Sequence, residues 1–496
     1  MDIISADSLI KKYKYSSGKA DGILKLHIIF YEETLMNAKI VKMKENTPVL
    51  AGLKKLCHRN MYSFHALPIS SHGQSDIVGD TREVLSECLE GSATGELFDN
   101  FFFPHGIIAE SQRLTAELYN ADASFYITSG TSTSNQIAIT ALFEKDQCVL
   151  IDKNCHQSIH FHAQAIGAEV HYLCPDLYTM DKEISAWSYA HLENTLLSLQ
   201  NEGKGCDIVI LTAQSYEGII YDIPQVLAHL LSAGVQARKF FIDEAWGSLN
   251  YFSEDTRQLT AMNIDSLLEL YPDLEVICTH SAHKSLFCLR QASIIHCRGK
   301  KDLPEKIETA KYRIHTTSPS YPILASLDAA QAMMSVKGEI LAIHTRELIH
   351  EFIMGISGIA GLGEKSICRD VFNTHWHIRY DPTKIMIDVS ALGTGQEIKK
   401  LLSEHGIYLK RFINNFILLN FHIGINREAI RCLLSSLTKI SKDNKINKEE
   451  ENSVANKFII SYPPGVPLVF PGDVISKDVR NKISECKRNG CLIIAA

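Results

Sequence analysis

The chain has 496 residues, with 45% hydrophobic and 22% charged side chains and a formal net charge of −7. This length exceeds one ordinary domain, and the composition is typical of a soluble globular protein rather than a disordered one. The negative charge disfavours nucleic acid as a partner. The 13 cysteines, an odd number without paired spacing, indicate reduced thiols rather than a disulfide framework.

The amino terminus lacks the cationic start and long apolar region of a targeting signal. The chain also lacks the uninterrupted run of about 18 apolar residues that a membrane-spanning helix needs. We therefore expect a cytoplasmic protein without a membrane partner. The first 43 residues carry no clear helical or strand periodicity, and we interpret them as part of an arm that contacts another subunit or as a small appended element.

Short apolar runs alternate with helix-compatible stretches, which predicts an α/β layer architecture with a mostly parallel sheet. The predicted strands are residues 124–128, 148–152, 169–173, 208–212, 239–243, 275–279 and 292–297. Polar motifs follow several of these strands directly. Because open α/β sheets bind ligands at the carboxyl ends of their strands, we expect one site there.

The first such motif is the hydroxyl-rich run of residues 128–135, Thr-Ser-Gly-Thr-Ser-Thr-Ser-Asn, which precedes the helix-compatible residues 137–143. Backbone N–H groups at a helix start, joined by hydroxyls such as those of Thr131 and Ser132, can bind a phosphate. An ordinary Ser/Thr helix cap is the alternative. The glycine spacing and Gly-Lys pair of a Walker loop are missing.

The second motif, residues 152–158, places His156 just beyond the end of a predicted strand. Its imidazole could lie flat on a cofactor ring. His156 and His160 are four residues apart and would share a helical face, so a metal site is the alternative. Neighbouring cysteines and acids do not complete a convincing ligand set, so ring stacking is favoured.

The third motif is the aromatic run of residues 240–247, Phe-Phe-Ile-Asp-Glu-Ala-Trp-Gly, in which Asp243 ends a predicted buried strand. An aspartate there could pair with the pyridinium nitrogen of pyridoxal phosphate and keep it protonated. A helix-capping or metal-binding role for this acid is the alternative.

The fourth and most informative motif is Ser281-Ala282-His283-Lys284, which follows another strand-like run. A lysine in this setting can hold an aldehyde cofactor as a Schiff base, while Ser281 and His283 supply hydrogen bonds to its phosphate and ring.

The remaining chain predicts a second, smaller unit. Helix-compatible stretches at 323–335 and 340–353 bridge to an α/β region at 355–439, with strands near 384–389 and 416–421. The charged residues 442–456 are interpreted as a solvated linker. The proline-rich residues 462–471 are interpreted as an extended arm too rigid for regular structure.

The order of these motifs resembles that of the fold-type I pyridoxal phosphate enzymes, and in detail the ornithine/lysine/arginine decarboxylase family of bacteria. The strings that carry the finer resemblance are Thr-Thr-Ser-Pro-Ser-Tyr-Pro at 316–322 with Ala-Ser-Leu-Asp at 325–328, and Tyr-Pro-Pro-Gly-Val-Pro-Leu at 462–468. The resemblance implies four regions: an arm at 1–60, a cofactor-binding large domain at 61–335, a small α/β domain at 336–445, and a linker with a carboxy-terminal segment at 446–496.

The resemblance also implies a role for each matching residue. Lys284 would carry the cofactor, Asp243 would pair with its ring nitrogen, and His156 would stack on the ring. The phosphate would be bound by Thr131, Ser132 and Ser281, with His283 beside it and Trp246 near the phenolic oxygen. The implied activity is decarboxylation of arginine, lysine or ornithine in polyamine metabolism. The implied assembly is a homodimer or higher homo-oligomer.

Several positions depart from the family pattern, among them Arg290, which stands before Gln291 where the family often has a threonine. The segment from Phe64 to His72 lacks the usual glycine and lysine, Leu249 stands where a histidine is common, and Lys410 stands where an acid is usual. The two cations Lys410 and Arg411 would repel the distal amine or guanidinium of a basic substrate. An oxidative or eliminating enzyme with the same cofactor is therefore the alternative. A catalytically silent homologue is disfavoured, because Lys284, Asp243 and His156 all persist.

Overall fold

The computed structural model divides the chain into two compact units, residues 1–61 and 62–496. It describes residues 62–65, 68, 99–369, 371–409, 411–451, 454–462 and 466–475, with 479, 482, 483, 486 and 492–495 beyond them. The predicted arm at 1–60, most of the departing segment after His65, and Lys410 lie outside these described residues.

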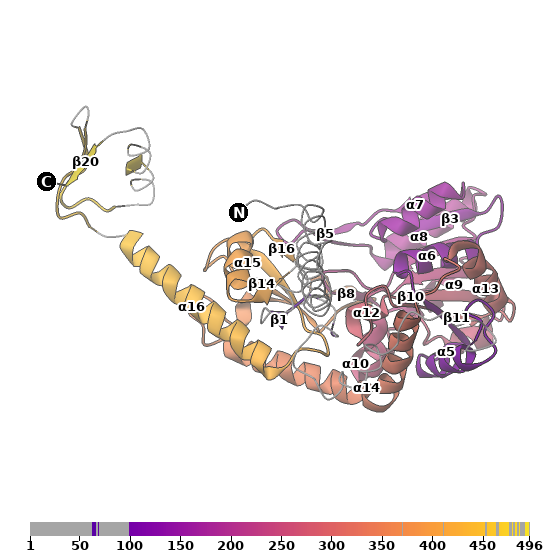
Figure 1. Ribbon diagram of the computed structural model, residues 1–496. Coiled ribbons are helices and arrows are strands. Elements are labelled where there is room, and N and C mark those ends of the chain that lie inside the picture. The colour runs from indigo at the N-terminus through magenta and orange to yellow at the C-terminus, as the bar shows by residue number, and fades with distance from the viewer. Residues whose placement is uncertain are drawn as a thin grey trace, which may run out of the picture. The chain divides into compact units, whose positions relative to one another are not determined.

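A seven-stranded sheet forms the centre of the larger part of the fold (Figure 1), in the order β2-β11-β10-β9-β7-β3-β4. The strands are β2 (Ala123–Ile127), β3 (Cys148–Asp152), β4 (Glu169–Leu173), β7 (Ile208–Thr212), β9 (Lys239–Asp243), β10 (Glu275–His280) and β11 (Ser293–Gly299). The pairs from β10 to β4 are parallel, whereas β11 runs antiparallel to both of its neighbours. The predicted α/β fold with a mostly parallel sheet is confirmed.

Helices cover both faces of this sheet, and the alternation of side chains along the strands assigns each face its own core. Phe240 and Ile242 of β9 join one hydrophobic cluster, while Phe241 between them joins the other. Buried residues of α5 (Ile107–Leu118), α8 (Tyr189–Asn201), α9 (Ile223–Ser232) and α14 (Tyr321–Ile356) belong to the first cluster. Those of α6 (Thr131–Leu142), α7 (Gln157–Ala165) and α13 (Leu303–Ile314) belong to the second.

A four-stranded antiparallel sheet forms a second layered region, in the order β12-β14-β17-β16. Its strands are β12 (Ile367–Cys368), β14 (Lys384–Asp388), β16 (Arg411–Ile413) and β17 (Phe416–Asn420), and helix α15 (Gly395–Glu404) packs on it. The two helical stretches predicted before it form one 36-residue helix, α14. Leu324 of α14 lies in the first core cluster and Phe352 in that of the small sheet, so this helix joins the two regions.

Shorter elements complete this part of the fold. They are β1 (Tyr62–Ser63), β5 (Leu177–Thr179), β6 (Ile184–Ala186), β8 (Ile219–Tyr221), β13 (Ile378–Tyr380), β15 (Ile407–Tyr408), α10 (Glu254–Arg257), α11 (Asp265–Leu270), α12 (Ala282–Ser285), and the 3₁₀ helices η2 (Gly247–Phe252) and η3 (Glu364–Ser366). Strand β13 pairs with β8, so the two regions exchange backbone hydrogen bonds, and β1 pairs with β15 beside the core of the small sheet.

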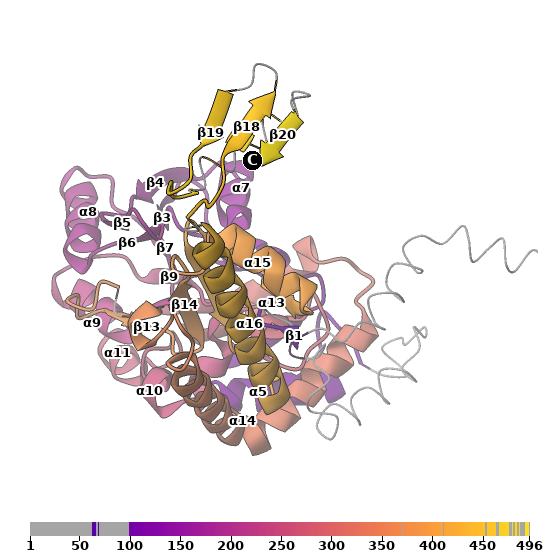
Figure 2. The same ribbon diagram turned by 90° about the vertical axis from the view of Figure 1, so that its left-hand side faces the viewer.

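Two expectations for the carboxy-terminal part are corrected. Helix α16 (Arg427–Glu451) continues into the segment interpreted as a linker, because lysine and glutamate have a high helix propensity. The proline-rich segment forms regular structure: β18 (Ile459–Tyr462) pairs with β19 (Val466–Val469) and β20 (Leu492–Ala495), as Figure 2 shows. Pro467 is tolerated because β19 is an edge strand of this sheet.

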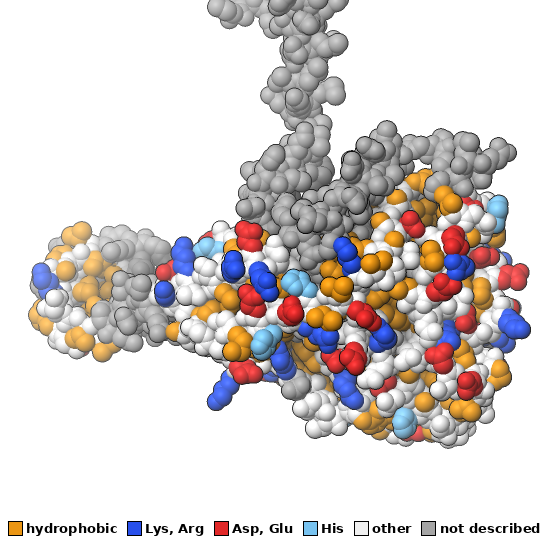
Figure 3. Space-filling model, turned by 90° about the horizontal axis from the view of Figure 1, so that it is seen from below, with side chains coloured by type: hydrophobic (Ala, Val, Ile, Leu, Met, Phe, Trp, Pro, Cys, Tyr) orange, Lys and Arg blue, Asp and Glu red, His pale blue; other side chains and the backbone are white. Residues whose placement is uncertain are grey.

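The surface turned to the viewer in Figure 3 carries acidic and basic side chains interspersed with one another. Among the residues that the structure describes, no helix combines the length and the apolar character that crossing a bilayer requires.

Candidate active site

The four sequence motifs converge at one edge of the seven-stranded sheet, where the parallel strands end. Asp243 is the last residue of β9, and Lys284 lies in the short helix α12, after the end of β10. His156 follows β3 and caps helix α7. The charges of Lys284 and His156 both act on Asp243, so the structure brings these three side chains into one electrostatic environment.

Asp243 is a buried carboxyl group, with only 4% of its surface exposed. Burial raises its pKa, while the nearby charge of Lys284, the N–H of Ala245 and the charge of His156 oppose that rise. The Ala245 N–H donates to Asp243 Oδ1 at 3.1 Å. A buried carboxylate of this kind favours a positively charged or N–H-donating partner, which is the chemistry of a pyridinium nitrogen.

The hydroxyl-rich motif of residues 128–135, here called the cradle, lies at the start of helix α6. Gly130 precedes this helix with φ of +87°, and no side chain caps the first helical N–H groups. Thr131 Oγ1 exchanges a hydrogen bond with Ser281 Oγ and donates to Ser293 Oγ at 3.0 Å. The buried hydroxyl of Ser129 has no hydrogen-bond partner among the residues that the structure describes. Uncapped N–H groups, hydroxyls and the positive end of the helix dipole suit an anion such as phosphate.

His156 presents an imidazole that is fixed but remains accessible. Its Nδ1 lies 2.9 Å from Ser158 Oγ and accepts from the Ser158 N–H. The residue is exposed, yet enough protein surrounds it that desolvation lowers the pKa of its ring. Asn135 of α6 donates to Ser158 Oγ at 3.1 Å and thereby links this cap to the cradle helix. An accessible imidazole held in place in this way suits stacking on a cofactor ring.

Trp246 lies between the catalytic motif and the small sheet. The ammonium of Lys284 is 4.5 Å from the centre of the Trp246 ring, and that of Lys384 is 4.1 Å from the same centre. Tyr216 packs edge-on against Trp246 with ring centres 5.5 Å apart. The ring of His65 lies 6.2 Å from that of Trp246, and the rings of His65, Tyr216 and Trp246 line a small cavity, here called the aromatic chamber, together with Lys384 and Asn420.

The other two predicted site residues occupy less central positions. His283 Nδ1 donates to the carbonyl of Ala292 at 2.9 Å, and burial lowers the pKa of its imidazole. Ser132 lies in the first turn of α6 with an exposed side chain. Both remain within the motifs that contain Lys284 and the cradle, but neither makes a direct side-chain contact with them among the hydrogen bonds of the described residues.

Residues of the small sheet also reach this chamber, and two of them, Lys384 and Asn420, were not predicted from the sequence as site residues. Lys384, at the start of β14, is buried and donates to Asn420 Oδ1, while Asn420 Nδ2 donates to the carbonyl of His65 at 2.6 Å. Arg411 forms a 2.6 Å ion pair with Glu217. The available signal was a lysine in a predicted buried strand, since such a residue is seldom buried without a partner.

Leu249, one of the positions that depart from the family pattern, is 8% exposed and packs in the large hydrophobic cluster. It therefore fills the core in the described structure. The alternative metal pair also stays incomplete, because His160 Nε2 lies 3.1 Å from the backbone carbonyl of Cys155.

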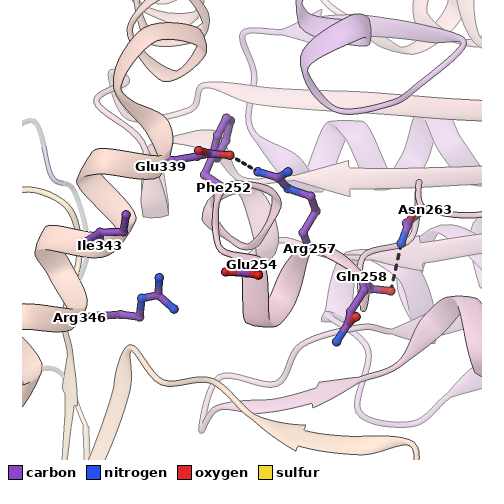
Figure 4. A pocket seen from close by; sticks show the side chains of 8 residues that line it. All are labelled: Phe252, Glu254, Arg257, Gln258, Asn263, Glu339, Ile343 and Arg346. Atoms are coloured by element: carbon purple, nitrogen blue, oxygen red, sulfur yellow. Dashed lines mark hydrogen bonds and ion pairs between the residues drawn. The ribbon is translucent and has the colours of Figure 1, made fainter.

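A surface groove elsewhere contains none of the predicted site residues (Figure 4). It lies beside η2, α10 and α14, and its lining includes Phe252, Ile343 and the two arginines Arg257 and Arg346. Arg257 is paired with Glu339 at 2.6 Å, and Arg346 with Asp255 at 2.5 Å. Both arginines are therefore held in ion pairs, and the groove contains none of the motifs that meet at the sheet edge.

The side chains at the sheet edge fit pyridoxal phosphate. Thr131, Ser281 and the start of α6 provide for a phosphate, Asp243 for a protonated ring nitrogen, and Lys284 for an aldehyde. The exposed imidazole of His156 offers a surface for the ring. The orphaned Ser129 hydroxyl beside the cradle indicates that a hydrogen-bonding partner belongs there.

Comparisons with known proteins point in the same direction. Residues 48–429 match the model of the "Orn/Lys/Arg decarboxylase, major domain". An arginine decarboxylase of Bacillus subtilis is 26% identical over 477 residues, which cover 88% of this chain and 92% of that protein. A lysine decarboxylase of Hafnia alvei is 25% identical, covering 88% of this chain and 65% of that protein.

A solved structure supports the fold independently. Lysine decarboxylase A from Pseudomonas aeruginosa superposes with a TM-score of 0.61 at 19% identity, covering 90% of this chain and 78% of that one. The family match spans well over half of the sequence, and the fold agrees with it. The chain therefore belongs to the Orn/Lys/Arg decarboxylase family of pyridoxal phosphate-dependent carboxy-lyases.

Proposed function

We propose that this protein decarboxylates a basic amino acid (arginine, lysine or ornithine) to the corresponding amine, as a step of polyamine metabolism. The observation that carries the proposal is the convergence of Asp243, Lys284, His156 and the Thr131–Ser281 hydroxyls at the edge of the central sheet where β2, β3, β9 and β10 end. The matched relatives with arginine and lysine decarboxylase names support the substrate class.

In this proposal the cofactor, when bound, supplies an electron sink for the pair left by the breaking bond between the α-carbon and the carboxylate. Asp243 holds the proton on the ring nitrogen. Thr131, Ser132, Ser281 and the start of α6 bind the phosphate, and His156 covers one face of the ring. These contacts fix the ring in one orientation, so that a bound amino acid presents its carboxylate in a single geometry.

Lys284 would hold the aldehyde of the cofactor, and it would have a second task as a proton carrier whenever its amine is not attached to the cofactor. Its Nζ then carries a proton next to the reacting centre and can deliver that proton to the α-carbon as CO2 leaves. Trp246, 4.5 Å from this ammonium, limits the positions that the lysine side chain can take. The proton given to carbon replaces the lost carboxylate, so the products are CO2 and the amine.

The distal end of the substrate would lie toward the aromatic chamber. Glu217 is an acid at its border, and its side chain is 14% exposed and paired with Arg411. A substrate ammonium or guanidinium could take the place of the Arg411 guanidinium at the Glu217 carboxylate, because both groups are cations that donate hydrogen bonds. Lys384 and Arg411 also place positive charge near the chamber, which is the specific reason to keep an oxidative or eliminating reaction as the second candidate.

The decisive experiment measures CO2 and product mass with L-arginine, L-lysine and L-ornithine, in air and without oxygen. Release of CO2 and the matching amine in both atmospheres is the expected result. A keto or hydroxylated product that requires oxygen would contradict decarboxylation and establish the second candidate. Absence of any turnover together with a normal visible cofactor band would contradict the basic-substrate assignment.

We also propose a cytoplasmic homodimer, since fold-type I sites are commonly completed by a second subunit. Exposed aromatic side chains beside the cradle helix support this proposal: Phe103 is 51% exposed and packs against Tyr312, which is 56% exposed. Light scattering behind size exclusion should give twice the chain mass of 55.5 kDa. A monomer that is fully active would overturn it.

A further inference from the structure

Four buried polar side chains cross the central sheet in the spatial order of its strands. Ser124 lies on β2, His296 on β11, His280 at the end of β10, and Glu244 directly after β9. These strands are consecutive neighbours in the sheet, although they are far apart in the chain. None of the four side chains belongs to the four sequence motifs in a predicted role, and each residue is at most 3% exposed.

Hydrogen bonds connect the four side chains into a continuous relay. Ser124 Oγ lies 2.7 Å from His296 Nδ1, and His296 Nε2 lies 3.1 Å from His280 Nδ1. His280 Nε2 lies 3.0 Å from Glu244 Oε2. One assignment of protons satisfies every bond: each group donates to the next in the direction of Glu244, and both imidazoles are neutral.

Glu244 is the end of this relay, and its carboxylate is saturated with donors. Its Oε2 also accepts from the Tyr251 hydroxyl at 3.0 Å and from the Cys278 thiol at 3.1 Å. Its Oε1 accepts from the Ala261 N–H at 3.3 Å. A buried carboxylate with this many donors has little capacity left for a ligand, so its role is to hold its donors in place.

The same relay is joined directly to the candidate active site. Glu244 is the chain neighbour of Asp243, and its N–H donates to the Thr279 carbonyl of β10 at 3.2 Å. The His280 carbonyl accepts from Ser293 Oγ at 2.7 Å, and Ser293 in turn contacts the cradle residue Thr131. Neighbouring residues of a strand project to opposite faces, so Glu244 and Asp243 act on different sides of the sheet.

We propose that the relay Ser124–His296–His280–Glu244 is a positioning device for the cofactor. It holds the ends of β9 and β10 together from the side opposite Asp243, and so sets the separation between Asp243 and the loop that carries Ser281 and Lys284. The inference rests on the proposed roles of Asp243 and Lys284. It adds four residues that touch neither cofactor nor substrate but act through those that do.

The atom types of Glu244, Cys278 and His280 also suit a metal ion, since their potential ligand atoms lie within 4.8 Å of one another. The relay explains this cluster without a metal ion, because the Cys278 thiol and the His280 imidazole already donate hydrogen bonds to the same carboxylate oxygen of Glu244. Metal analysis of the purified full chain should therefore give well below one equivalent. A stoichiometric ion that survives dialysis would overturn the hydrogen-bonded relay.

The test compares His280→Leu with His280→Gln, whose amide can both donate to Glu244 and accept from His296. His377 provides the matched control. It is 1% exposed and bonded to the Trp187 carbonyl at 3.1 Å, and it belongs to neither the relay nor the site. The full-length apoprotein of each variant is titrated with pyridoxal phosphate, and its thermal midpoint is recorded in parallel.

We expect His280→Leu to weaken cofactor binding about tenfold and to change the visible band of the bound cofactor, because a buried carboxylate loses a donor at the strand ends. His280→Gln should recover most of this loss, and His377→Leu should lower the thermal midpoint without changing cofactor affinity. Unchanged cofactor affinity and an unchanged visible band in a folded His280→Leu protein would overturn the inference. An equal loss of cofactor affinity in His280→Leu and His377→Leu would overturn it as well.

Borohydride labelling of the wild-type protein distinguishes a failure of the proposed active site from a failure of the relay alone. If borohydride fixes no cofactor to wild-type Lys284, the roles of Lys284 and Asp243 fail and the inference fails with them. If the wild type is labelled at Lys284 and the His280→Leu variant binds equally well, only the relay fails.

Discussion

Two adjacent carboxyl groups at the end of β9 have opposite environments. Asp243 accepts the Ala245 N–H, lies near the charges of Lys284 and His156, and has its pKa raised by burial. Glu244 accepts bonds from a hydroxyl, a thiol, an imidazole and a backbone N–H. Both are nearly inaccessible to solvent, at 4% and 2%.

The difference teaches how a site can be recognised among buried acids. A carboxylate with a full set of protein donors stabilises the fold around it, whereas one with spare acceptor capacity and nearby cations is prepared for a ligand. Burial and the sequence Asp-Glu do not separate the two roles. The hydrogen-bond donors around each carboxyl group separate the two roles. Substitutions of the two acids and of their neighbours should therefore differ in their effects on activity and on stability.

The largest effect is expected for Lys284→Ala. Loss of the amine removes both the attachment point of the cofactor and the proposed proton donor, so activity should fall by about a thousandfold or more. Borohydride reduction followed by peptide mass analysis checks the attachment directly. Lys204→Ala, which removes an exposed lysine paired with Glu202, is the control and should retain activity.

Asp243→Asn and Glu244→Gln should separate function from stability. Asn cannot hold a proton on the ring nitrogen, so the first variant should lose about a hundredfold in kcat with a thermal midpoint near that of the wild type. The second should lower the free energy of unfolding by about 1–3 kcal/mol, because it disturbs a saturated buried acceptor. Equal loss of stability in both variants would contradict the comparison.

His156→Ala is expected to have a smaller effect. The imidazole would contribute stacking on the cofactor ring, and its loss should weaken cofactor binding by about tenfold. His156→Phe keeps an aromatic face and should recover part of this affinity. An alanine variant with wild-type affinity, measured by titration of the apoprotein, would assign His156 to capping α7 only.

The smallest effect concerns Lys384 and the pH dependence of stability. Burial lowers its pKa from 10.5 to about 8, with the charge of Lys284 acting in the same direction and Asp381 opposing it. Between about pH 8 and pH 10.5, Lys384 is protonated in the unfolded chain but largely neutral in the folded protein, so the free energy of unfolding rises with pH. Below this window, the folded protein bears the full cost of burying the charged lysine.

Lys384→Met should therefore flatten that rise. Urea unfolding of the apoprotein at about pH 7.5 and about pH 10 compares the variant with the wild type. Lys239→Met is a suitable control. This lysine is the first residue of β9, at the end of the strand away from Asp243, and its ammonium is paired with Glu144 at 2.7 Å. The same slope in Lys384→Met and the wild type would show that Lys384 is not the group responsible.

The sequence alone located the central strands and four clusters of site residues, because both signals are local. A buried parallel strand is a short apolar run, and the polar residues that follow it lie at its carboxyl end wherever that strand sits in the sheet. Asp243, Lys284, His156 and Thr131 could therefore be predicted as members of one site. The same local reasoning was wrong for residues 442–451, since a charged composition does not distinguish a linker from a helix.

Strand order and packing between the two regions could be decided only by the tertiary structure. The strand β11 was predicted, but its antiparallel direction and its place between β2 and β10 were not, and they alone bring Ser124, His296 and His280 into one line. Lys384 and Arg411 reach Trp246 and Tyr216 from more than 130 residues further along the chain. Such contacts follow from how the folded layers meet, and no local pattern of apolar and polar residues encodes them.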